Sequence, residues 1–229
     1  MTQGPDALAA PSPSRRALCP ACQRPLASCL CRWAAPTDHQ VEVLILQHPL
    51  EVNQAKGSAR LLQLSLARCR LFVGETFDPV SLEAWLRPPG SSRRPVLLYP
   101  DTDAQADPGL RSAPAACPDE LQDPARLRLV VLDGTWRKSR KMLYLNALLQ
   151  QLPRLALHDP PPSHYRAVRR ARRPDQLSTL EATVLALQQL ESTTARGDPQ
   201  RWQALLEAFD GFVEDRLVRA ASSSGPPCR

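Results

Sequence analysis

Short apolar runs alternate with stretches of helical periodicity along most of the chain. An apolar run of about four to eight residues between turn residues predicts a buried strand, and apolar residues at every third or fourth position predict an amphipathic helix. The predicted strands are Val41–Gln47, Leu71–Gly74, Val96–Tyr99, Leu127–Leu132 and Arg154–His158. The predicted helices are Gln54–Arg68, Val80–Arg87, Thr135–Gln151, Thr179–Ser192 and Gln200–Arg219. This alternation indicates an α/β fold, with a mostly parallel sheet and flanking helices.

Three segments lack this pattern. Residues 1–17 and 220–229 are rich in Ala, Pro and Ser without an apolar period, so we predict that both are disordered tails. Residues 101–125 are polar and contain proline, which predicts a long surface loop. A chain of 229 residues suits one domain with additions. We assign residues 35–219 to that domain and residues 18–34 to a separate cysteine-rich segment.

Composition adds a partner class and a compartment. The formal net charge is +6 and the isoelectric point is near 9.2, which favours a polyanionic partner such as nucleic acid. No stretch is apolar enough for a membrane helix, and the first 18 residues lack the apolar core of a secretory signal. We therefore expect a cytoplasmic protein without a membrane partner, and nothing in the sequence indicates an obligate protein partner. Thiols stay reduced in the cytoplasm, so clustered cysteines indicate a metal site rather than disulfides.

Four cysteines lie close together near the N-terminus. Cys19, Cys22, Cys29 and Cys31 follow the spacing C-x2-C-x6-C-x-C, which is short enough for four thiolates to bind one tetrahedral ion. Zinc fits such a soft ligand set best. Because a four-thiolate site has no open coordination position, this zinc is expected to be structural. The alternative is reduced cysteines packed as small apolar groups, which the polar composition of the segment disfavours.

Polar residues follow the first predicted strand. Gln47 ends this strand, His48 comes next, and Lys56 and Arg60 lie in the first turns of the following helix. Ligands often bind at the carboxyl ends of parallel strands, so these residues are candidates for ligand binding. A polar turn followed by a solvated helix end explains the same pattern equally well.

A second candidate position follows the buried strand that ends at Leu132. The turn into the next helix consists of Asp133, Gly134, Thr135 and Trp136. Lys138 and Lys141 lie in the first turns of that helix, where positive charge opposes the helix dipole and therefore suggests phosphate contact. The alternative is structural: Asp133 or Thr135 caps the helix, Gly134 permits the turn and Trp136 packs.

The start of the fourth predicted helix carries a capping signature. Ser178 at the N-cap position and Glu181 three residues later predict a capping box, with Thr179 between them.

A cluster of arginines precedes this helix. Its members are Arg166, Arg169, Arg170, Arg172 and Arg173. Five guanidinium groups in eight residues favour nucleic-acid binding, and a solvated basic face is the alternative.

Together these motifs resemble the DTW-domain family. The resemblance rests on the four-cysteine spacing, on Gln47-His48-Pro49 with Glu51, on Lys56-Gly57-x-x-Arg60, on Asp133-Gly134-Thr135-Trp136 and on Leu177-Ser178-Thr179-Leu180-Glu181-Ala182. Members of this family are tRNA-uridine aminocarboxypropyltransferases related to the SPOUT class of RNA-modifying proteins. The resemblance therefore implies a SPOUT-like α/β sheet with a cofactor-binding knot in its C-terminal part.

The resemblance also implies a reaction. The 3-amino-3-carboxypropyl group of S-adenosylmethionine moves to N3 of a tRNA uridine, and methylthioadenosine leaves. The Ala, Arg, Leu and Pro bias looks bacterial, which favours a uridine of the variable loop. Asp133 is the candidate catalytic residue, either as the base for N3 or as the partner of the donor's amino group. Sequence does not separate these two roles.

The resemblance assigns the remaining candidates to two groups. The residues expected at the S-adenosylmethionine site are Gln47, His48, Leu132, Gly134, Thr135, Trp136, Ser178, Thr179 and Glu181. The residues expected to bind tRNA are Lys56, Arg60, Lys138, Lys141, Arg166, Arg169, Arg170, Arg172 and Arg173. Among the first group, Trp136 is expected to stack on adenine or on the flipped uridine.

Two other functions account for part of the sequence. A SPOUT-type RNA methyltransferase uses the same donor but releases S-adenosylhomocysteine. A zinc-containing RNA-binding protein without catalysis explains the charge and the cysteines, and it would not bind S-adenosylmethionine.

Overall fold

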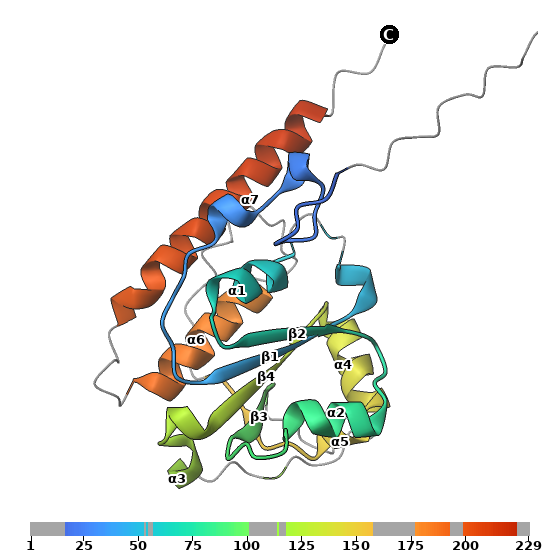
Figure 1. Ribbon diagram of the computed structural model, residues 1–229, viewed down its shortest axis with the longest axis vertical. Helices are drawn as coiled ribbons and strands as arrows, with labels where there is room; N and C mark the ends of the chain where they lie inside the picture. The colour runs from blue at the N-terminus through green and yellow to red at the C-terminus, as the bar shows by residue number, and fades with distance from the viewer. Residues whose placement is uncertain are drawn as a thin grey trace, which may run out of the picture.

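A computed structural model of the chain describes residues 17–52, 54, 57–100, 114, 118–157, 177–192 and 199–223. Its centre is a five-stranded sheet with the order β2-β1-β4-β3-β5 (Figure 1). The strands are β1 Glu42–Gln47, β2 Cys69–Val73, β3 Arg94–Leu98, β4 Leu127–Asp133 and β5 Arg154–Leu155. Every neighbouring pair is parallel, so the predicted α/β class is confirmed.

The central strand β4 is buried on both faces, as a near-continuous apolar run requires in a parallel sheet. Because successive side chains point to opposite faces, Leu129 and Val131 enter one apolar core and Val130 and Leu132 enter the other. Strand β1 divides in the same way. The sheet therefore separates two cores.

Helices cover both faces of the sheet (Figure 1). On one side lie α1 Ala59–Ser65, α6 Thr179–Glu191 and α7 Gln203–Ser223. On the other side lie α2 Pro79–Leu86, α4 Trp136–Leu145 and α5 Ala147–Gln150. None of the described helices is long and apolar enough to span a membrane.

The chain diverges between the adjacent strands β1 and β4. After β1 it leads to α1 on one face, and after β4 it leads to α4 on the other. In open α/β sheets such a divergence opens a crevice outside the carboxyl ends of the two strands. The register pairs Gln47 with Asp133 at this position.

Two predicted helices were wrong in extent. The helix predicted from Gln54 begins only at Ala59, because the chain first forms a 3₁₀ turn at Pro49–Glu51 and a turn closed by the Gly57 N–H on the Gln54 carbonyl. The helix predicted over Thr135–Gln151 breaks at Asn146, which has a ψ of 91°. The Asn146 side chain explains the break, because it bonds the backbone of Met142, Glu75 and Phe77.

Other boundaries also differ. The predicted loop 101–125 contains the short helix α3 Pro118–Leu121, and a 3₁₀ turn at Pro124–Arg126 completes the approach to β4. The first residue of α3 is a proline and the next two are acidic, which suits a helix start. The last helix consists of a 3₁₀ turn at Pro199–Trp202 and of α7, which continues to Ser223. Strand β5 ends at Leu155, although the prediction extended it to His158, which lies outside the described residues.

Several predictions fall outside the described residues. These are the chain ends 1–16 and 224–229, most of the loop 101–117, and residues 158–176, which join β5 to α6. The knot stays a prediction, because residues 158–176, in the C-terminal part where it is expected, lie outside the described residues.

Candidate functional site

The carboxyl ends of β1 and β4 and the start of α6 meet at Asp133. One oxygen of its carboxylate, Oδ2, accepts a hydrogen bond of 2.8 Å from Gln47 Nε2, and the other, Oδ1, accepts one of 2.6 Å from Thr179 Oγ1. Its backbone carbonyl accepts the His48 N–H at 2.9 Å. Three segments distant in sequence thus converge on one carboxylate.

Asp133 is buried, with 6% of its surface exposed. Burial raises the pKa of this carboxyl above its ordinary value, and the hydrogen bonds from Thr179 and Gln47 oppose the rise. A carboxylate that is costly to ionise in place is a stronger proton acceptor than one in water. Both oxygens keep lone pairs beyond the two bonds that they accept.

The capping part of the structural alternative for this turn is wrong. The N-cap residue of α4 is Thr135, and its side chain makes no capping hydrogen bond. The Asp133 carboxylate faces Gln47 and Thr179 instead of the helix start. Gly134 does have a steric role, because an added Cβ would lie 3.1 Å from the Cβ of Lys138.

His48 lies beside Asp133 and has a defined tautomer. Its Nδ1 accepts the Leu50 N–H at 3.1 Å, so this nitrogen carries a lone pair. The proton is therefore on Nε2, which lies 2.9 Å from Glu75 Oε1. His48 is 5% exposed, and its side chain also caps the 3₁₀ turn at Pro49–Glu51.

Glu75, which follows β2, was not among the predicted site residues. It accepts hydrogen bonds from His48 and, at 2.9 Å, from Lys141 Nζ. The hydrogen bond from Lys141 lowers the pKa of Glu75, and that from His48 lowers it further. An acidic residue two positions after a parallel strand is a detectable signal, since such strands present ligands at this end. A second pair, Lys138 with Glu51 at 2.7 Å, joins α4 to the turn after β1.

Trp136, the first residue of α4, forms an aromatic stack with Tyr99 after β3. The ring centroids are 5.0 Å apart and the planes differ by 15°. Tyr99 is buried and the Arg154 guanidinium lies 5.2 Å from its ring centroid, whereas 56% of Trp136 is exposed. One face of the indole is thus held by protein while much of the ring remains exposed.

The predicted capping box of α6 is confirmed. The Ser178 hydroxyl accepts the Glu181 N–H at 3.1 Å, and the Glu181 carboxylate accepts the Ser178 N–H at 2.8 Å. Both side chains therefore fix the helix start that carries Thr179.

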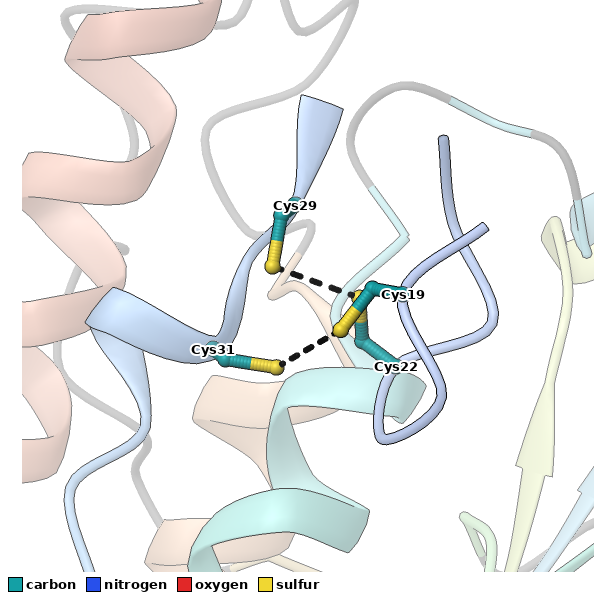
Figure 2. Close-up of side chains that lie close together, drawn as sticks. All are labelled: Cys19, Cys22, Cys29 and Cys31. Carbon is teal, nitrogen blue, oxygen red and sulfur yellow. Dashed lines mark hydrogen bonds between the residues drawn. The ribbon is translucent and has the colours of Figure 1, made fainter. Parts of the chain in front are cut away.

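The four cysteines form a second site. Figure 2 shows their sulfur atoms pointing toward one another from two segments of the chain. The Sγ atoms of Cys19 and Cys31 are 3.6 Å apart and those of Cys22 and Cys29 are 3.8 Å apart. All four sulfur atoms lie within 4.8 Å of one another.

These distances suit a tetrahedral metal ion. Four sulfurs at about 2.3 Å from zinc are about 3.8 Å apart. The backbone N–H groups of Cys22 and Ala21 lower the pKa of the Cys19 thiol to about 6, which favours the thiolate that binds metal. Cys19 and Cys22 are buried, so the site is closed on this side.

Comparison with known proteins identifies the family of this chain. A family model described as the DTW domain matches residues 16–217. The chain belongs to the DTW-domain family. The matched range contains the cysteine cluster, all five strands and most of α7.

Three curated relatives of this DTW domain carry closely related names. The chain is 31% identical over 221 residues to tRNA-uridine aminocarboxypropyltransferase 2 of Drosophila melanogaster, which covers 93% of this chain and 80% of that protein. It is 29% identical over 186 residues to the protein of the same name from Macaca fascicularis, and this alignment covers 77% of this chain and 57% of that protein. It is 28% identical over 140 residues to tRNA-uridine aminocarboxypropyltransferase A of Arabidopsis thaliana, and this alignment covers 56% of this chain and 51% of that protein. The chain thus spans little more than half the length of the last two relatives. No solved structure matches the chain significantly.

The residues predicted to bind tRNA are only partly described. In this DTW domain Lys138 and Lys141 form ion pairs with Glu51 and Glu75, and Arg60 on α1 donates to Gln63 Oε1 at 2.5 Å. Lys56 and the cluster Arg166, Arg169, Arg170, Arg172 and Arg173 lie outside the described residues. Their contact with tRNA stays a prediction.

Proposed function

We propose that this protein transfers the 3-amino-3-carboxypropyl group of S-adenosylmethionine to N3 of a tRNA uridine in the variable loop. The observation that carries the proposal is the buried Asp133 carboxylate at the carboxyl ends of β1 and β4, in a chain of the DTW-domain family. The names of the curated relatives give the reaction class, an alkyl transfer to tRNA. Such an enzyme works where tRNA is found, and we place it in the cytoplasm.

The reaction exchanges one bond for another. Uridine N3 forms a bond to the γ-carbon of the aminocarboxypropyl arm while the bond from that carbon to sulfur breaks. The sulfur leaves as neutral methylthioadenosine, and the N3 proton passes to a base. Because the methyl carbon of the donor is also activated, the position of the arm relative to N3 decides which group moves.

Asp133 is the proposed base. Its raised pKa favours proton uptake, and the hydrogen bonds from Gln47 and Thr179 fix the direction of its remaining lone pairs. The second role is that of a charge partner for the donor's ammonium group, which the same burial also supports. Loss of donor affinity in a variant lacking the charge would assign the second role.

The other residues of the site hold and orient the donor and the uridine. Trp136, stacked on Tyr99, offers a flat surface to adenine or to the flipped uridine. His48, with Gly134 and Thr135, lines the turns next to Asp133. Leu132 belongs to the apolar core below the site, and Ser178 and Glu181 set the start of α6.

We assign zinc to the four cysteines. The donor set and the sulfur distances fit this ion, and a site with four protein ligands leaves no position for substrate. Its contribution is to fold the cysteine-rich segment, not to act on uridine.

The test is direct. The protein is incubated with S-adenosylmethionine and unmodified tRNA, the nucleosides are analysed by mass, and the small product is identified. We expect a uridine heavier by one aminocarboxypropyl group, together with methylthioadenosine. S-adenosylhomocysteine and a methylated nucleoside would instead show a methyltransferase. Failure to bind S-adenosylmethionine would favour an RNA-binding protein without catalysis.

A further inference from the structure

The outer face of α4 carries an unusual set of side chains. Trp136, Arg140 and Tyr144 are four residues apart, so they share one side of the helix. Trp136 is 56% exposed, Tyr144 is 59% exposed, and Arg140 between them is also exposed. Arg137 adds a further exposed cation at the start of the helix.

Helix stability does not explain this set. The ten residues of α4 include four cations and no acidic residue. Arg137 and Lys138 lie in the first turn, where positive charge opposes the helix dipole. The packing of α4 depends on Ser139, Met142 and Leu143, which are buried on the opposite side.

The two lysines of α4 take part in ion pairs within the protein. Lys138 pairs with Glu51 and Lys141 pairs with Glu75, on the side of α4 that faces the site. Trp136, Arg137, Arg140 and Tyr144 are exposed on an adjacent side of α4, and we call these four residues the α4 stripe.

The stripe begins at the candidate active site and leads away from it. Trp136 is three residues after Asp133, and its stack on Tyr99 holds the indole in one orientation. Tyr144 is eight residues further along, a distance of about 12 Å at 1.5 Å per residue. A strand of nucleic acid that enters the site can therefore contact both aromatic rings.

We propose that the α4 stripe binds the single-stranded loop of tRNA on either side of the target uridine. A nucleobase next to this uridine stacks on Tyr144, while Arg137 and Arg140 contact the phosphates between Tyr144 and the site. Aromatic rings separated by cations suit unpaired RNA, because bases stack on the rings and the backbone follows the positive charge. The assignment of tRNA as the partner rests on the proposed function.

The test uses three variants of exposed side chains. Tyr144→Leu removes the ring and keeps an apolar side chain, Tyr144→Phe keeps the ring, and Arg140→Gln removes a charge. The control is Arg126→Gln, because Arg126 is an exposed arginine that precedes β4 and so lies at the opposite end of the strand from Asp133. Dissociation constants for unmodified tRNA are measured over a range of salt concentrations, and that for S-adenosylmethionine is measured in the absence of tRNA.

We expect Tyr144→Leu to weaken tRNA binding by about 5- to 150-fold, the range for loss of one base stack, without changing the salt dependence. Tyr144→Phe should bind like the unsubstituted protein. Arg140→Gln should reduce the slope of log affinity against log salt by about one, and Arg126→Gln should not. All four variants should bind S-adenosylmethionine with unchanged affinity.

The outcomes separate this proposal from the proposed function. Unchanged tRNA binding in both Tyr144→Leu and Arg140→Gln, with transfer still observed, would overturn the α4 stripe and leave the function intact. An equal loss of tRNA affinity in Arg126→Gln would also overturn the proposal, because the loss would then reflect the overall positive charge of the protein and not the position of Arg140. If the unsubstituted protein transfers no group but binds tRNA in a manner that depends on Tyr144, the α4 stripe is supported and the proposed function is refuted.

Discussion

The Asp133 site and the cysteine site differ in how the chain builds them. Asp133, Gln47 and Thr179 come from β4, β1 and α6, so their contacts exist only when the sheet and α6 have assembled. The four cysteines lie within thirteen consecutive residues, and their sulfur atoms converge through two short turns. One site depends on the whole fold, and the other is nearly local.

They also differ in what they contribute to stability. The buried Asp133 carboxylate bonds to two neutral side chains, Gln47 and Thr179, so its ionisation is costly in the folded state. The cysteine site instead supports packing, since the segment around it docks on α7 (Figure 1). Arg216 and Arg219 of α7 donate to the carbonyls of Ser28 and Ala27. A metal bound only by the folded segment therefore stabilises α7 as well.

The docking between these segments is close. Arg32 pairs with Asp215 of α7 at 2.6 Å, and Gly211 lies against the Trp33 ring. A Cβ added at Gly211 would lie 2.5 Å from that ring, so only glycine allows this approach. On its other side the segment reaches the turn after β1, where Arg24 donates to the Gln54 carbonyl at 2.8 Å. The cysteine site thus holds two distant parts of the chain.

The largest effect is expected at the Asp133 site. Asp133→Asn removes charge and basicity, and its amide can still bond Thr179 and Gln47 if the Gln47 amide turns over. Transfer should fall by a hundredfold or more, equivalent to about 2.7 kcal/mol in the barrier. If the variant keeps its affinity for S-adenosylmethionine but loses transfer, Asp133 acts as the base. If the variant loses that affinity, Asp133 acts as the charge partner of the donor's ammonium group. Full activity would refute both roles.

The same variant tests the cost of burial. The folded-state pKa of Asp133 is raised, so the folded protein holds the proton where the unfolded chain has lost it. Stability therefore falls as pH rises from the unfolded value through the folded one, and the full penalty is present above the folded value. Asp133→Asn should be as stable as the unsubstituted protein at pH 7 or more stable, and the difference should shrink toward pH 4. Urea unfolding at several pH values measures this.

The second effect separates the cysteine site from the Asp133 site. A Cys22→Ser, Cys29→Ser variant should lose its zinc, which costs about 2.7 kcal/mol of stability when free zinc stands at 100 times its dissociation constant. Hydrogen exchange should rise first in residues 17–34 and in α7, because these segments contact each other directly. Affinity for S-adenosylmethionine should change less than in a charge-partner variant of Asp133. Stoichiometric zinc in the purified variant would contradict the assignment.

The difference between the sites explains what could be predicted from sequence. The cysteine spacing and the Ser178–Glu181 capping box depend on neighbours within a few residues, so local patterns sufficed. Gln47 and Asp133 could be placed at the carboxyl ends of strands, but their direct contact depends on the register of β1 against β4. Glu75 was missed together with the helix break at Asn146, and the two are linked, because Asn146 Nδ2 donates to the Glu75 carbonyl across 71 positions. No local sequence pattern predicts such a contact.

The smallest effect is expected from Glu75, which touches His48 and Lys141 but not Asp133. Its lowered pKa keeps it ionised down to acid pH, so it should add no pH dependence to transfer between about pH 5 and pH 8. Glu75→Gln should slow transfer by about tenfold, because a neutral amide holds the Nε2 proton of His48 and the Lys141 ammonium less firmly. Nitrogen-15 chemical shifts of the His48 ring report this directly, since they distinguish the two tautomers. The matched control is Glu83→Gln, which removes an exposed carboxylate paired with Arg87 on α2 and should change neither quantity. If Glu75→Gln leaves both the transfer rate and the ring shifts unchanged, Glu75 is a surface ion pair and the Asp133 site works without it.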